Sequence, residues 1–74
     1  MALFRITVTR SVILGGEELE AGMSVDVSCS GLFVSDPLGY QGGQRVADAF
    51  WRMYGVDIKD VHALRNYVKI QKIS

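Results

Sequence analysis

Hydrophobic and polar residues alternate in two segments of the first half of the chain. In residues 3–10, Phe4, Ile6 and Val8 take every second position, and β-branched residues are frequent. This pattern is typical of a strand with one buried face. Residues 23–29 show the same alternation, with the apolar positions Met23, Val25, Val27 and Cys29. The sequence therefore predicts two half-buried strands.

A tight hairpin is predicted between these strands. The apolar run 12–14 leads into Gly15 and Gly16, and the acidic segment 17–20 follows. Paired glycines suit the positive φ angles of a two-residue hairpin turn. We therefore expect two short strands that flank Gly15 and Gly16.

Turn residues dominate the middle of the chain, from 30 to 43. Residues 36–39 read Asp-Pro-Leu-Gly, with proline at the second turn position and glycine at the fourth, which is typical of a β-turn. Residues 32–34 are a possible short strand inside this segment, and the rest is predicted to be loop.

Helical periodicity follows, and it predicts the main helix at about residues 43–54 with Gly55 as the stop. Its apolar residues cover an arc of about 200°, roughly twice the width that an ordinary surface helix needs. We therefore expect part of this arc to meet a partner. The candidate interface residues are Trp51, Phe50, Tyr54 and Ala47.

The last part of the chain predicts a short helical turn and a final strand. Asp57 is expected to cap a helical turn at about residues 58–65. The segment 67–73 is expected to form a C-terminal strand with Val68 and Ile70 inward. Together the elements predict one α+β domain over residues 1–74. We expect a small antiparallel sheet or open barrel of three to five strands, with the main helix across it.

Composition adds size and charge to this picture. Eight Lys and Arg residues balance eight Asp and Glu residues among 74 residues. Residues 1–40 carry two arginines against five carboxylates, and residues 41–74 carry six cations against three carboxylates. A fold of this length seldom has a large core, and many such domains gain stability by oligomerisation. The charge asymmetry would let an acidic partner approach the C-terminal half, or two copies associate acid to base, unless folding mixes the charges.

Several classes of protein are not expected from the sequence. No apolar run approaches the roughly 20 residues of a membrane span, and the N-terminus does not resemble a secretory signal. One cysteine, Cys29, and one histidine, His62, make neither an internal disulfide nor a cluster of soft metal ligands. We therefore expect a cytoplasmic protein of bacterial type, without a cofactor or metal and without enzymatic activity.

Two functional hypotheses follow. The first is a non-enzymatic protein-interaction module that forms a homodimer through the main helix. The alternative is a nucleic-acid accessory protein that uses the basic C-terminal half, where cations lie near aromatic residues suited to base stacking. The neutral net charge and a pI near 6.5 disfavour this alternative. Its candidate contacts are Arg45, Arg52, Arg65, Lys69 and Lys72.

The chain also resembles a known family. The segment from Gly42 to Lys59, the terminal segment 68–73 and the turn at 20–25 look like a small family of uncharacterised bacterial proteins, a domain of unknown function. The resemblance spans most of the chain. It implies no activity, ligand or catalytic residue.

Overall fold

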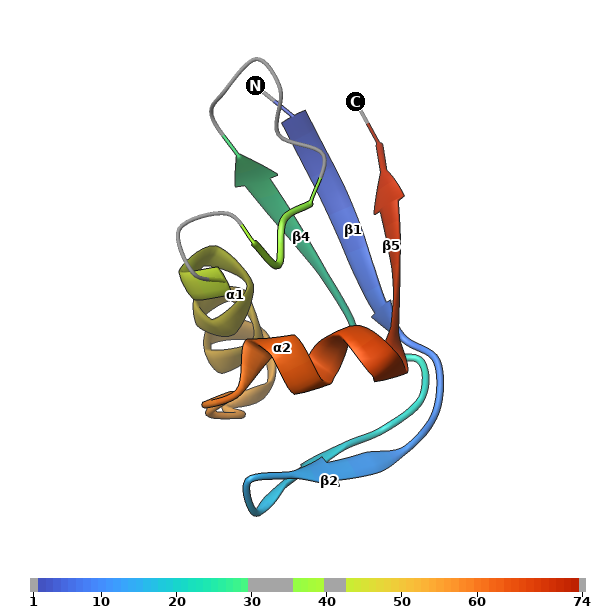
Figure 1. The fold of residues 1–74 in the computed structure, drawn as a ribbon, viewed down its shortest axis with the longest axis vertical. Coiled ribbons are helices and arrows are strands. Elements are labelled where there is room, and N and C mark those ends of the chain that lie inside the picture. The colour runs from blue at the N-terminus through green and yellow to red at the C-terminus, as the bar shows by residue number, and fades with distance from the viewer. Residues whose placement is uncertain (1, 30–35, 40–42, 74) are drawn as a thin grey trace.

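The computed structural model describes residues 2–29, 36–39 and 43–73. These ranges form an α+β fold, as the sequence predicts (Figure 1). Its elements, in chain order, are β1 (Ala2–Val8), β2 (Val12–Leu14), β3 (Glu17–Leu19), β4 (Ser24–Cys29), α1 (Gln44–Tyr54), α2 (Val61–Leu64), the 3-10 helix η2 (Arg65–Tyr67) and β5 (Val68–Lys72).

The strands form two open antiparallel sheets. The larger sheet has the order β4-β1-β5, and β2 pairs with β3 in a separate hairpin. Figure 1 shows this hairpin at one end of the molecule, whose longest dimension is 35 Å, with α1 beside β4. Within the described residues, β4 and β5 each pair with β1 alone, so the predicted small antiparallel sheet is confirmed in its open form.

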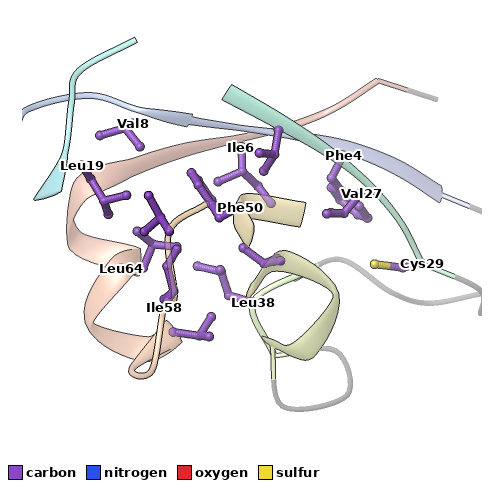
Figure 2. Close-up of a cluster of buried hydrophobic side chains, with 14 of the residues drawn as sticks. Phe4, Ile6, Val8, Leu19, Val27, Cys29, Leu38, Phe50, Ile58 and Leu64 are labelled. Atoms are coloured by element: carbon purple, nitrogen blue, oxygen red, sulfur yellow. The ribbon is translucent and has the colours of Figure 1, made fainter. Parts of the chain in front are cut away.

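The core lies between the larger sheet and the helices. The alternation in β1 buries Phe4, Ile6 and Val8, and in the sheet register Phe4 lies opposite Val27. Figure 2 shows Phe50 and other side chains of the second half approaching this sheet face. Each fully buried side chain of this size stabilises the fold by about 1.5–3 kcal/mol. The buried apolar residues are Ala2, Phe4, Ile6, Val8, Leu19, Val25, Val27, Cys29, Leu38, Val46, Phe50, Val56, Ile58, Val61 and Leu64.

The predicted hairpin and turn are both present. Gly15 and Gly16 have φ angles of 56° and 84°, as a two-residue hairpin turn requires, and Leu19 anchors β3 in the core. At the turn, the Gly39 amide donates to the Asp36 carbonyl at 3.1 Å, and the Leu38 amide donates to the Asp36 side chain at 3.1 Å. The possible strand at 32–34 lies outside the described residues.

Helix α1 begins and ends where the sequence predicts. Gly43 precedes it with a φ of 79°, and Gly55 ends it with a φ of 68° and donates its amide to the Trp51 carbonyl at 2.9 Å. Both glycines adopt the left-handed conformation, which other residues reach only with strain.

The predicted short helical turn is present, but its start and its cap differ from the prediction. The structure has α2 at Val61–Leu64, continued by η2, and the cap is Asp60, whose side chain accepts from the Ala63 amide at 3.1 Å. The predicted start at Ile58 lies in a non-helical segment, from which this side chain is buried in the core. The helix therefore begins after Asp60, because this residue and not Asp57 satisfies an amide of its first turn.

The final strand is one residue shorter at each end than predicted. β5 places Val68 and Ile70 on the core-facing side of the sheet, where both are half-buried against the core. Among the helices that the structure describes, none is long and apolar enough to cross a membrane.

Candidate functional site

Two neighbouring aromatic residues of α1, Phe50 and Trp51, lie in different environments. Phe50 is 0% exposed and fills the core together with Val46, whereas Trp51 is 60% exposed. One residue step turns a helix by about 100°, so Trp51 lies well around the helix from the buried side. The wide apolar arc is therefore divided between the core and the surface.

The predicted interface residues fall into different environments. Ala47 is half-buried and Tyr54 is 39% exposed, so both border the surface around Trp51. Phe50 belongs to the core and offers no surface to a partner. Met53, 65% exposed, is an apolar surface residue that the sequence analysis did not single out. Its position within the apolar arc did not reveal which side of α1 the sheet covers.

Tyr54 attaches the end of α1 to the start of β4. Its hydroxyl accepts from the Ser24 amide at 2.9 Å and donates to the Ser24 carbonyl at 3.1 Å. Its ring lies 6.1 Å from that of Phe50, tilted by 35°, within the range of favourable aromatic pairs. Tyr54 therefore links Phe50 in the core to the backbone of β4 at the edge of the sheet.

A groove of about 340 Å³ is lined by residues of both α1 and β4. Arg45 and Arg52 line it from the helix together with Asp48, and Asp26 and Ser28 line it from the strand. Asp48 accepts from the Gln44 side-chain amide at 2.8 Å. The groove thus carries cations and carboxylates side by side, which gives it little net charge.

An ion pair lies on the outer face of the sheet, across β1 and β4. The Arg5 guanidinium donates to the Asp26 carboxylate from Nε at 3.0 Å and from Nη2 at 3.3 Å. These hydrogen bonds lower the pKa of Asp26 and raise that of Arg5. Because both side chains are about half exposed, water and salt weaken the pair.

A second ion pair joins the two halves of the chain. Arg65 Nη2 donates to Asp36 Oδ2 at 2.6 Å, and this bond lowers the pKa of Asp36. Since Arg65 comes from η2 and Asp36 from the turn at 36–39, the pair holds the turn against the C-terminal elements. The charge asymmetry along the sequence is thus partly neutralised in the fold.

The five candidate nucleic-acid contacts are spread over three elements. Arg45 and Arg52 lie on α1, beside β4, while Lys69 and Lys72 lie on β5 at the opposite side of the sheet. Arg65 is engaged with Asp36. The structure therefore does not gather these cations into one stripe, and nucleic-acid binding stays a prediction.

Cys29 and His62 occupy unrelated positions. Cys29 is fully buried at the end of β4, and burial raises the pKa of its thiol. His62 is exposed on α2. Within residues 2–29, 36–39 and 43–73, no three His, Cys, Asp or Glu side chains gather closely enough to hold a metal ion.

Comparison with known proteins places the chain in a family. No curated protein and no solved structure matches it. A sequence model described as "Family of unknown function (DUF6140)" matches residues 1–70, which is almost the whole chain, and so confirms the resemblance noted in the sequence. The chain therefore belongs to this family of unknown function, DUF6140.

Proposed function

We propose that this chain is a non-enzymatic protein-interaction module that associates with a second copy of itself. The observation that carries the proposal is the exposure of Trp51, the one tryptophan of the sequence, at 60% on α1. The inward side of the same helix is already filled by Val46 and Phe50, so the fold itself does not require this large side chain. Tryptophan is among the residues that contribute most to protein–protein contacts.

The surroundings of Trp51 support the same proposal. Tyr54, three positions further along α1, lies on the same side as Trp51 and is 39% exposed, while its hydroxyl is hydrogen-bonded to Ser24. An apolar centre with a polar residue anchored beside it is common in interfaces between proteins. The short chain adds a reason, because a domain of this size buries a smaller fraction of its surface than larger domains do.

Light scattering coupled to gel filtration tests the proposal directly. We expect the mass to rise from monomer toward dimer as the protein concentration increases through tens and hundreds of micromolar. The emission of Trp51 should shift to shorter wavelength over the same range, because association removes the indole from water. A constant monomer mass together with unchanged emission would refute the proposal.

Matched variants distinguish a specific contact through Trp51 from non-specific hydrophobic association. Trp51→Ala should lower the dimer fraction, whereas Ile13→Ala, at a side chain 70% exposed on the hairpin, should leave it unchanged. Equal losses in both variants would contradict a specific role for Trp51. Circular dichroism of each variant checks that the fold is retained.

A further inference from the structure

The two outer strands of the larger sheet, β4 and β5, differ in what lies beside them. At β4, the Tyr54 hydroxyl occupies both the amide and the carbonyl of Ser24, and α1 runs alongside the strand. At the other side of the sheet, β5 is the last strand (Figure 1). An outer strand with an unpaired side is a template for pairing with another strand. The outer side of β5 is therefore better suited than that of β4 to pair with a strand of a partner.

Backbone hydrogen bonds define which residues of β5 turn outward. Just before the strand, the Thr9 amide donates to the Tyr67 carbonyl at 2.8 Å, and just after it the Ile73 amide donates to the Leu3 carbonyl at 2.7 Å. Antiparallel pairing alternates along a strand, so the odd-numbered positions between them also turn toward β1. The amides and carbonyls that turn away from β1 belong to Val68, Ile70 and Lys72.

The side chains of β5 limit what such a partner can be. Val68 and Ile70 are half-buried, so a further strand would cover their remaining apolar surface. Lys69 and Lys72 are exposed, and lysines on an outer strand usually oppose pairing. A suitable partner strand must therefore have its free amides and carbonyls directly opposite those of Val68, Ile70 and Lys72. It must also place no cation directly opposite either lysine.

A second copy of β5 meets both conditions in one register. We propose that two copies pair antiparallel through β5 about a twofold axis at Ile70, so that Ile70 faces its own counterpart and Val68 faces Lys72 of the second copy. Every outward amide and carbonyl of β5 then meets an outward group, which gives about six backbone hydrogen bonds. Lys69 faces Gln71 of the second copy, so no lysine lies directly opposite another. The two three-stranded sheets become one continuous sheet.

Neighbouring registers fit less well. A shift of two residues toward the N-terminus places Lys69 directly opposite Lys69 of the second copy, and like charges in that position destabilise a sheet. A shift of two residues the other way leaves Val68 beyond the paired part of the second β5. A shift by a single residue brings outward groups against inward ones. The register centred on Ile70 is therefore the one that the charges and the hydrogen-bond phase favour together.

This inference rests on the proposed self-association and assigns to it a contact surface other than Trp51, the strand β5, with a stated register. It is separable from the Trp51 contact, because Trp51 lies on α1 and not on the sheet. The register also predicts how salt acts. The two Lys69 side chains remain diagonal neighbours, about 7–8 Å apart at the backbone, so added salt should strengthen the dimer. An association of the acidic half with the basic half would instead weaken in salt.

Disulfide trapping tests the register. In a Cys29→Ala background, we expect Ile70→Cys to form a disulfide-linked dimer under mild oxidation, because directly paired residues have Cα atoms about 5.5 Å apart, within disulfide range. Gln71→Cys is the matched control, since position 71 faces position 69 of the second copy. The expected rate difference is at least about tenfold in favour of Ile70→Cys. Equal rates would overturn the register.

A backbone variant provides a second test that does not depend on cysteine. Lys72→Pro removes an outward amide without removing a hydrogen bond to β1, so the monomer should stay folded while the dimer is lost. Lys72→Ala, which keeps the amide, should still dimerise. A Lys72→Pro protein that dimerises as strongly as Lys72→Ala would overturn the proposal.

The outcomes distinguish this inference from the proposed function. A wild-type protein that stays monomeric at every concentration refutes both. A dimer that depends on Trp51, weakens in salt and is not trapped at position 70 keeps the proposed function and refutes pairing through β5. Trapping at position 70 with an unchanged dimer in Trp51→Ala supports β5 and removes Trp51 from the contact.

Discussion

The Tyr54 hydroxyl holds both backbone polar groups of Ser24, at 2.9 Å from the amide and 3.1 Å from the carbonyl. A side chain from the end of α1 thus takes the place that a neighbouring strand would occupy beside the first residue of β4. The contact both ties the helix to the sheet and closes part of one side of the sheet to other strands.

Tyr54→Phe should reduce stability by about 1 kcal/mol, because it removes two hydrogen bonds at a site where water replaces them in part. Urea unfolding followed by circular dichroism measures the change. Tyr67→Phe is the matched control, since it keeps the ring over which the Arg10 guanidinium lies at 4.8 Å. Equal midpoints for wild type and Tyr54→Phe would mean that the Ser24 contact contributes nothing to stability.

The glycines at the two ends of α1 allow a sharper comparison. Both have positive φ, but a Cβ on Gly43 would lie 2.5 Å from Val61 Cγ1, whereas a Cβ on Gly55 would meet nothing within 4 Å. Gly55→Ala should therefore cost about 1–2 kcal/mol, the strain of the left-handed conformation alone. Gly43→Ala should cost about 3 kcal/mol, because overpacking against α2 is added.

Thermal and urea unfolding of the two variants decide this point. A Gly43→Ala protein as stable as Gly55→Ala would show that α2 moves away from α1 at little cost. The double variant Gly43→Ala with Val61→Ala tests the stated cause, because the smaller side chain removes the close contact. It should therefore be less destabilised than the sum of the two single variants.

The sequence predicted elements well where periodicity alone decides them. Apolar and polar residues alternate with period two in β1 and β4. Gly15 and Gly16 are residues that readily adopt the positive φ angles of the hairpin turn. It did not predict the start of α2, because the burial of Ile58 depends on the distance of that segment from the sheet. Local capping rules cannot include such a tertiary requirement.

The candidate site shows the same limit only in part. The apolar arc of α1 predicted that some apolar residues would stay outside the core, and Trp51 and Met53 do. At 100° per residue Phe50 lies at the centre of that arc and Trp51 at one end, so the arc did hold the signal that Phe50 faces the sheet and is unavailable to a partner. Contacts between distant positions, such as Arg65 with Asp36, leave no local signal because their two partners are placed by different elements.

The Arg65–Asp36 pair predicts a pH dependence. Its hydrogen bond lowers the pKa of Asp36 in the folded protein below the unfolded value of about 3.9. The stabilisation is therefore complete above about pH 4 and is lost as the pH falls through the folded pKa. Because both side chains are more than 40% exposed, we expect less than about 1 kcal/mol.

Urea unfolding of wild type and Asp36→Asn across this pH range measures the effect. The variant should be less stable above about pH 4 and should approach wild type at lower pH, as Asp36 becomes protonated. Asp57→Asn, at an exposed carboxyl elsewhere, should follow the wild-type curve. A constant difference between Asp36→Asn and wild type at all pH values would assign the loss to the turn rather than to the ion pair.

Cys29 should report local opening of the sheet. Its side chain is fully buried at the end of β4, and this burial raises the pKa of the thiol, while the nearby Arg45 charge partly opposes the shift. Only an exposed thiolate reacts quickly with a disulfide reagent. At pH 8 we therefore expect native Cys29 to react far more slowly than a free cysteine, and to reach the free rate once urea unfolds the chain. Gly43→Ala should speed the reaction because it increases the open population, so a native rate equal to that of free cysteine would contradict the burial of Cys29.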